Sequence, residues 1–472
     1  MFKNFLRLTL GFTLFAGCVR YTPRPIDPPA LEQSYRIRDL SDPNLRAFFT
    51  ANLAIDSSTW PPRSLDFDAL TLLAFYFSPE MDASRSAVAA AEGAIITAGA
   101  RLNPSGGSRA GYTDAEQSPY AFGLGVEIPF ETGGKRRIRV QRAQQLSEAA
   151  RFTLGDTAWQ LRSRLRATLV DHLISNRELE QRIAEEGIRE EAVEIYEKRL
   201  EFGDVSRPEL TVARSALASI QIEIEQLRGK VAETRSAVAG VLGLPPLALS
   251  GAEFAGVDLE KPPQEESLDI RLVQKQGLLN RLDVQRLLAE YAAAESDLQL
   301  QVARQRPNIT LGPAYSFGEG ANSYTIGPSL LLPLLDRNKG PIAEADARRT
   351  AAGDRFLNAQ AQVIDEMDRA LIAYRSALRE FESADAMVST VTREREESAR
   401  RLFEAGEVDR LALVQARLES ATVARLRLTA LRRAQNGLGA LEDAVQHPLP
   451  GGSRMLQPPL TNPREQRDGG SR

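Results

Sequence analysis

The chain contains two copies of one long segment, and this duplication restricts the fold more than any other feature. The first copy carries RLEFGDVSRPELTVAR from Arg199, and the second carries RLFEAGEVDRLALVQAR from Arg401. Gly203 falls on Gly406 and Arg214 on Arg417, an offset of about 203 residues. A solenoid repeat is only roughly 20–50 residues long. We therefore expect a duplicated domain, with the first repeat over 64–250, a linker over 251–280 and the second repeat over 281–447.

Both repeats have the same order of elements: a helix, two short strands, a very long helix, a glycine turn and a second long helix. The segment 135–200 contains no proline, and its apolar residues recur every three or four positions, which is typical of an amphipathic helix. At 1.5 Å per residue, some 65 residues would extend about 100 Å, a length that favours coiled-coil packing. We expect first helices at about 82–102 and 281–305, and long helices at about 135–201, 206–242, 341–403 and 409–445.

A glycine lies at each turn between two long helices. Gly203 and Gly406 each follow a helix, where a glycine accepts the left-handed backbone of a helix C-terminus. Ser206, followed three residues later by Glu209, predicts a capping box for the next helix. The two tips of the helical hairpins are therefore expected at Gly203, Asp204, Val205, Gly406, Glu407 and Val408.

Three of four short segments between the helices alternate between apolar and small residues, whereas the first, at 105–114, is weaker and has only Tyr112 as a clearly apolar residue. We expect strands at about 105–114, 120–128, 308–317 and 324–332, each close to the length of a tilted membrane strand. The small-residue face holds mostly Gly, Ala, Ser and Thr. The apolar face, which we expect to contact lipid, comprises Tyr120, Phe122, Leu124, Ile309, Leu311, Phe317, Tyr324 and Ile326.

Four strands cannot close a barrel, and open sheet edges are not tolerated in lipid. Several copies of the chain must then share one barrel, and eight, twelve or sixteen strands would all satisfy closure. The alternative is an ordinary antiparallel sheet that packs on a core.

The N-terminus predicts export. Residues 1–17 have a basic start and a short apolar run, as in a signal peptide, and Leu14-Phe15-Ala16-Gly17 before Cys18 resembles the lipobox of bacterial lipoproteins. Cys18 is the only cysteine and would carry covalent lipid; Val19 in place of an aspartate favours the outer membrane. The alternative is an ordinary signal peptide in which Cys18 is incidental. We expect an extended segment over 18–63 and a flexible tail over 448–472.

The composition argues against enzymatic and nucleic-acid roles. The net charge is −4, with basic and acidic residues interspersed, so no nucleic-acid-binding surface is predicted. Two histidines and one cysteine cannot form the usual metal site. We find no catalytic triad, and we expect no cofactor beyond the lipid. Gly133, Gly134 and Gly340 are interpreted as strand-to-helix hinges, and the basic run that follows, 135–142, either contacts anionic head groups or forms a solvated helix face.

The order of elements, the duplication and the glycine tips resemble the TolC-like outer-membrane efflux proteins. ETGGKR from Glu131 and LPLLDRNKGPIAEADAR from Leu332 are similar to the CzcC-type branch, which serves heavy-metal pumps. The resemblance implies a mainly α fold with a small β part, in which a homotrimer shares a twelve-stranded barrel and a long periplasmic helical tunnel. It also implies hairpin tips that face a periplasmic adaptor protein, and an inner-membrane pump of the resistance-nodulation-division class.

The function implied is a passive exit duct in a tripartite efflux system, with metal cations as cargo. Some channels of this family carry aspartates six and nine residues after the second tip glycine, whereas this chain has Ala412 and Gln415. The nearest candidates for an acidic periplasmic mouth are Asp204, Glu407 and Asp409, which could equally be solvated turn and cap residues. Two alternatives are the same channel serving drug or protein export, and a lipid-tethered periplasmic coiled-coil scaffold.

Overall fold

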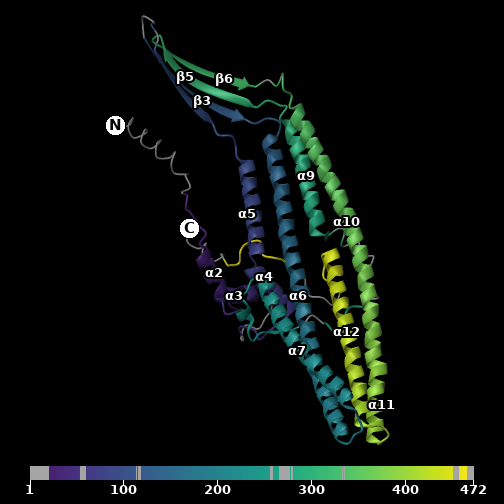
Figure 1. Cartoon of the computed structure of the whole chain (residues 1–472). Coiled ribbons are helices and arrows are strands. Elements are labelled where there is room, and N and C mark those ends of the chain that lie inside the picture. The colour runs from purple at the N-terminus through teal and green to yellow at the C-terminus, as the bar shows by residue number, and fades with distance from the viewer. Residues whose placement is uncertain are drawn as a thin grey trace.

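The structure is a computed structural model that describes residues 21–53, 60–112, 114, 119–255, 259–264, 277, 280–331, 333, 335–449 and 456–464. The expected signal peptide and Cys18 lie outside these residues. The described part is elongated, with a small sheet at one end and long helices that run away from it to two turns at the other end (Figure 1). The sheet and the hairpin tips are therefore at opposite ends of the molecule.

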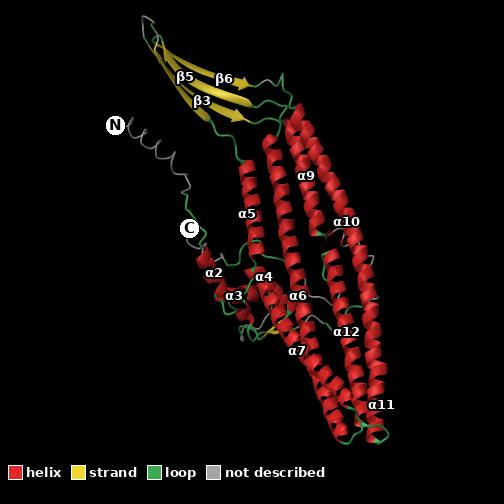
Figure 2. Cartoon of the chain, viewed as in Figure 1, coloured by secondary structure: helices red, strands yellow, loops and turns green. Residues whose placement is uncertain are grey.

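Helices make up most of the described chain, as the sequence predicted (Figure 2). The helix α6 is 67 residues long and packs along α5, α7, α9 and α12. In the described ranges, no helix is both long enough and apolar enough to cross a membrane. The helices of the two repeats are α5 (Pro79–Gly99), α6 (Lys135–Glu201), α7 (Arg207–Leu242), α9 (Leu282–Ala303), α10 (Lys339–Ala386), α11 (Arg393–Glu404) and α12 (Arg410–Val445).

The long helix of the second repeat is not one continuous α-helix, which differs from the expectation over 341–403. A π-helical turn, Met387–Thr392, separates α10 from α11. Within this turn, the side-chain hydroxyl of Thr392 donates to the carbonyl oxygen of Met387 at 2.9 Å, five residues back. The helical path still reaches Glu404.

The four strands expected between the helices form one antiparallel sheet in the order β2-β3-β5-β6, so β2 and β6 are its two edges within the chain. The last strand starts three residues earlier than expected, because Glu319 and Gly320 both have positive φ and make a two-residue hairpin turn. The strands are β2 (Ser105–Tyr112), β3 (Tyr120–Phe130), β5 (Ile309–Gly318) and β6 (Ala321–Leu330).

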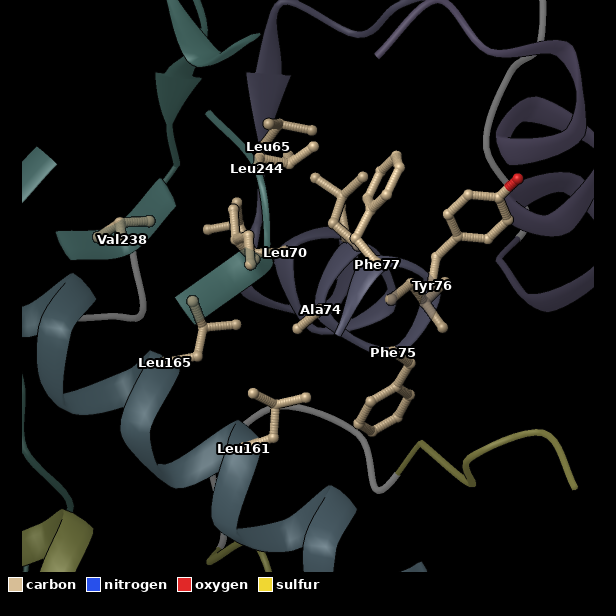
Figure 3. Packing of buried hydrophobic residues seen from close by; sticks show 14 of the residues in the cluster. Leu65, Leu70, Ala74, Phe75, Tyr76, Phe77, Leu161, Leu165, Val238 and Leu244 are labelled. Atoms are coloured by element: carbon tan, nitrogen blue, oxygen red, sulfur yellow. The ribbon is translucent and has the colours of Figure 1, made fainter. Parts of the chain in front are cut away.

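The main hydrophobic core lies at the waist of the molecule, around α4 (Phe67–Phe77). This helix is apolar on all sides, and it packs against Leu161 and Leu165 of α6 and against Val238 of α7 (Figure 3). Burial of each such side chain contributes about 1.5–3 kcal/mol. Next to this core, the short strands β1 (Ser64–Leu65) and β4 (Glu253–Phe254) pair in parallel and join the start of the first repeat to the start of the linker that follows it.

The expectation of an extended segment over 18–63 is wrong for two stretches, which form α2 (Pro28–Arg36) and α3 (Pro43–Asn52). Each begins with an Asp-Pro pair, in which the carboxylate of Asp27 or Asp42 caps the helix and proline occupies its first position. The Asp-Pro pairs are the sequence signal that was missed.

The expected flexible tail over 448–472 is also wrong for residues 456–464, which lie against α5. The Nε of Arg85 donates to the carbonyl oxygen of Pro459 at 3.0 Å, and Arg464 pairs with Asp82. The C-terminal segment therefore adds to the packing around the waist.

Candidate functional site

The register of the sheet separates two faces of different chemistry. Phe122 pairs with Phe317, Leu124 with Tyr315, and Tyr315 with Tyr324. Because directly paired residues point to the same side of an antiparallel sheet, every residue expected to contact lipid lies on one face. The predicted members of this apolar face are Tyr120, Phe122, Leu124, Ile309, Leu311, Phe317, Tyr324 and Ile326.

The apolar face is open in the single chain. Tyr120 is 68% exposed, Tyr324 80% and Ile326 70%, values far above those of core residues. At the end of β2 and the start of β3, Tyr112 stacks edge-on against Tyr120 at 5.9 Å between ring centroids, and the ring centroids of Tyr315 on β5 and Tyr324 on β6 lie 5.2 Å apart. An exposed apolar face of this kind needs a cover of lipid or protein.

The opposite face carries small residues, and it borders a hollow of about 850 Å³. Glycines at 107, 111, 123 and 125 keep this side of the sheet free of bulky groups. The charged residues that line the hollow include Arg109 and Glu127. The sheet can therefore present one side to an apolar medium and the other to water.

The two hairpin tips have the same backbone geometry. Gly203 and Gly406 have φ of 79° and 76°, which only glycine adopts readily. The next amide in each turn reaches back five residues: that of Asp204 donates to Arg199 and that of Glu407 donates to Leu402, both at 2.9 Å. This is the Schellman pattern that the glycines predicted.

The expected capping box is present, and the carboxylate of Glu209 accepts from the backbone N–H of Ser206 at 2.6 Å. These hydrogen bonds hold the pKa of Glu209 below its usual value. Val205 and Val408 are half-buried at matching positions, whereas Asp204 and Glu407 are exposed at the ends of the hairpins.

The carboxylate of Asp409 has two partners within the chain, so it is not a free acidic group of the kind expected at the periplasmic mouth. Its carboxylate caps α12 by accepting from the N–H of Ala412 at 2.8 Å, and it also forms an ion pair with Arg199 of α6. The Arg199 hydrogen bond, followed by the cap, lowers the pKa of Asp409. Because Arg199 belongs to the first repeat, this contact joins the two tips.

A second set of ion pairs lies nearby. Glu191 of α6 accepts from Arg410 at 2.6 Å and from Arg417 at 3.2 Å, both on α12. The sequence did not reveal these contacts, because charged residues on long helices usually face solvent and nothing in the spacing pairs one repeat with the other.

The strand-to-helix connections differ between the repeats. Gly133 and Gly134 have φ of 68° and 72°, and a Cβ on Gly133 would lie 3.3 Å from the carbonyl oxygen of Ala303. In the second repeat the left-handed residue is Asn338, with φ of 58°. Gly340 lies within α10 and has no positive φ, so the expectation of a hinge at Gly340 is wrong. Asparagine adopts this backbone more readily than most residues.

The basic run after Gly134 is largely engaged within the protein. The Nζ of buried Lys135 donates to the carbonyl oxygen of Arg306 at 2.7 Å and to Oδ1 of Asn308 at 2.6 Å. Arg139 forms an ion pair with Glu131. These residues brace the joint between the sheet and the helices.

A buried charged cluster joins the repeats at the waist, and sequence reasoning missed it. Glu442 of α12 is 3% exposed and lies 3.4 Å from the Nε of Arg166 and 3.6 Å from the Nη1 of Arg162. Arg166 also donates to the carbonyl oxygen of Gln435 at 2.8 Å. A Cβ on Gly439 would lie 2.6 Å from the Nη1 of Arg166, so glycine makes room for the guanidinium group.

In the described part of the chain, no group of three or more His, Cys, Asp or Glu residues is arranged to hold a metal ion. His172 is buried, with Nδ1 3.1 Å from the hydroxyl of Thr234, and burial lowers its pKa. His172 therefore packs inside the protein, in agreement with its place within a long helix.

Comparison with known proteins gives a family match for part of the chain. Residues 76–244 match the family model described as outer membrane efflux protein. The cobalt-zinc-cadmium resistance protein CzcC of Cupriavidus metallidurans is 24% identical over 295 residues, which cover 62% of this chain and 69% of the relative. The pyoverdine export outer membrane protein OpmQ of Pseudomonas putida is also 24% identical, over 69% of this chain and 74% of the relative.

Solved structures share the fold. The outer membrane protein VceC of Vibrio cholerae superposes with a TM-score of 0.64 at 20% identity, covering 82% of this chain and 96% of that one. The similarity therefore extends over nearly the whole length of VceC, including both repeats.

Proposed function

We propose that this chain is a TolC-like outer-membrane efflux protein without enzymatic activity, and that it forms the outer-membrane exit duct of an envelope-spanning efflux system; the family match over residues 76–244 and the shared fold of VceC support this proposal. Three copies would each contribute four strands to a twelve-stranded barrel, and their long helices would form the periplasmic tunnel. Cargo would pass through passively, driven by an inner-membrane pump.

The observation that carries this proposal is the two-faced sheet with two unpaired edges. The apolar side chains of β3, β5 and β6 are exposed in the single chain, and the edge strands β2 and β6 lack partners on their outer sides within the described residues. A membrane permits such a sheet only when its edges are closed. Other copies of the same chain supply the missing strands most simply.

The hairpin tips are the surface that we assign to a periplasmic adaptor protein. Asp204 and Glu407 are exposed at the far end from the sheet, next to half-buried Val205 and Val408. The adaptor would connect these tips to a pump of the resistance-nodulation-division class, as the resemblance implies. Asp204 and Glu407 are also the acids best placed for a periplasmic mouth, because Asp409 is engaged by Arg199.

Cys18 lies outside the described residues, and we propose that it carries a lipid anchor in the outer membrane. The test is mass spectrometry of the purified protein, in which an acylated N-terminal cysteine is expected. A Cys18→Ala variant, which cannot be acylated there, should lack the corresponding mass.

For the cargo we propose metal cations, supported by the CzcC-like strings in the sequence and by the similarity to CzcC. OpmQ is equally identical to this chain, which makes a larger organic cargo the second candidate. Deletion of the gene should raise sensitivity to divalent metals. Loss of siderophore or drug export with unchanged metal sensitivity would favour the second candidate.

Single-channel recording tests the proposed duct. Purified protein in a planar bilayer should give discrete conductance steps, and replacement of Arg199 by alanine should increase the open time by releasing a contact between the tips. Absence of conductance in both proteins would contradict a duct. It would support the alternative of a lipid-tethered coiled-coil scaffold.

A further inference from the structure

Two charged residues interrupt the small-residue face of the sheet. Among the described residues of the four strands, this face consists of Gly, Ala, Ser, Thr and Pro except at Arg109 and Glu127. Both side chains are exposed, and both border the 850 Å³ hollow. Within the described chain, neither forms a salt bridge.

Arg109 has space around it. It pairs with Gly123 across the strands, and the residues two positions away on its own strand are Gly107 and Gly111. On the neighbouring strand, Ala121 and Gly125 flank Gly123. These small neighbours leave Arg109 exposed, and it is one of the residues that line the hollow.

Arg109 and Glu127 lie at different positions along the strands. Glu127 pairs with Ser105, at the end of the sheet next to the helices, and Arg109 is four residues farther along β2. Four residues of an extended strand correspond to about 13 Å. In the trimeric duct proposed above, three Glu127 carboxylates would form a ring at the periplasmic end of the barrel, and three Arg109 guanidinium groups would form a second ring farther out.

The radius of a twelve-stranded barrel determines whether such a ring affects the whole duct. Strands about 4.8 Å apart and tilted by about 40° give a backbone radius of about 12 Å. An arginine side chain directed inward brings its charge within about one Debye length of the axis, roughly 8 Å at physiological ionic strength. Ions therefore cannot pass without entering the field of the ring.

We propose that Arg109 sets the charge preference of the barrel section, so that anions and anionic complexes pass more readily than bare cations. This inference rests on the proposed duct. It deepens that function by naming a residue that selects the form of the cargo: a metal would leave faster as an anionic complex than as the free ion. The carboxylate of Glu127 favours cations at the periplasmic end of the barrel, where cargo enters.

Thiol labelling tests this inference without requiring an open periplasmic end. A Gly107→Cys reporter is accommodated, because a Cβ there has no atom within 4 Å. The probes are an anionic and a cationic methanethiosulfonate reagent, applied to the detergent-solubilised full-length protein. With Arg109 present, the anionic reagent should react several-fold faster relative to the cationic one than with Arg109→Gln. Arg109→Lys should restore the preference, and protein with the native Gly107 measures the background from Cys18.

The outcomes separate the inference from the proposed function. Equal reagent preference in the Arg109 and Arg109→Gln proteins, or a reporter that reacts with neither reagent, would overturn the role of Arg109. Charge-dependent labelling without any bilayer conductance would retain Arg109 at a water-filled face but contradict the duct. Where conductance is present, the reversal potential in a salt gradient should shift toward cation preference in Arg109→Gln and toward anion preference in Glu127→Gln.

Discussion

Arg199 near the end of the first long helix binds Asp409, the residue that caps the last helix of the second repeat. One carboxylate thus stabilises a helix and ties two repeats together at the end of the molecule farthest from the sheet. The side chain of Asp409 has both roles, so variants that keep the cap and remove the ion pair can separate the two contributions.

Asp409→Ala should lose both the cap and the ion pair. The lost cap alone costs about 1 kcal/mol. Asp409→Asn retains a good capping residue and loses only the ion pair, and Arg199→Ala does the same from the other side. Hydrogen exchange of the amides at 411–414 should accelerate strongly in Asp409→Ala and little in the other two variants. Equal acceleration in all three would show that the ion pair, and not the cap, holds this helix end.

The tip should weaken in acid. The folded pKa of Asp409 is lowered, mainly by the Arg199 hydrogen bond, relative to an unfolded value of about 3.9. A lowered pKa stabilises the fold at pH values above the unfolded pKa, and this contribution is lost as the pH falls through the folded value. The ratio of exchange rates between Asp409→Asn and the native protein should therefore exceed one by a small, constant factor above about pH 5, begin to fall near about pH 4, and reach one once the pH is below the folded pKa. A ratio that changes near neutral pH would identify another titrating group.

The two faces of the sheet should respond differently to charge. Phe122→Arg places a cation on the apolar face, at a cost of about 2–4 kcal/mol if the site is near the middle of the membrane. Ser316→Arg, on the opposite face of the adjacent strand, should assemble normally. The measurement is the fraction of protein found as membrane-embedded oligomer. Equal defects in both variants would contradict the assignment of the faces.

The buried cluster at the waist should be sensitive to loss of its carboxylate. Glu442→Gln leaves Arg162 and Arg166 without their shared partner, and breaking a buried pair in this way costs about 3–5 kcal/mol. The matched control is Glu80→Gln, which breaks an exposed ion pair with Arg164. Arg164 lies on α6, as do Arg162 and Arg166, and the loss of this pair should cost less than about 1 kcal/mol. Thermal unfolding measures both variants, and similar shifts would show that burial does not distinguish the two sites.

The strand-to-helix joints should differ in their need for glycine. Gly134→Ala forces a left-handed backbone on a residue with a Cβ and should cost about 1–2 kcal/mol. Gly340→Ala lies within a helix and in open space, so it should be neutral or stabilising by up to about 1 kcal/mol. Unfolding midpoints of the two variants check this directly; destabilisation by Gly340→Ala would restore it as a candidate hinge.

Local patterns accounted for the elements that depend on neighbouring residues. The proline-free run ending before Gly203 predicted α6, and the buried Leu161, Leu165 and Leu169 are the apolar positions of its repeat. Strict alternation predicted the two faces of the sheet, because a strand's side chains alternate regardless of what surrounds it.

Contacts between the repeats could not be predicted in this way. Arg162 and Arg166 have the spacing of a solvated helix face, and only the packing of α12 against α6 buries them with Glu442. Asp409 could be recognised as a cap, but its pairing with Arg199 depends on how the two hairpins lie together. The left-handed backbone of Asn338 was not predicted, because a glycine, Gly340, lies two residues away and adopts this conformation more readily than asparagine.

In the proposed duct, each chain supplies only part of the barrel wall, and copies of the same chain close it. Native mass spectrometry of the full-length protein, released from detergent micelles, measures the number of copies directly. We expect a trimer that requires detergent to remain in solution. A monomer that is soluble in water without detergent, with Tyr120 and Ile326 shielded from solvent, would contradict it.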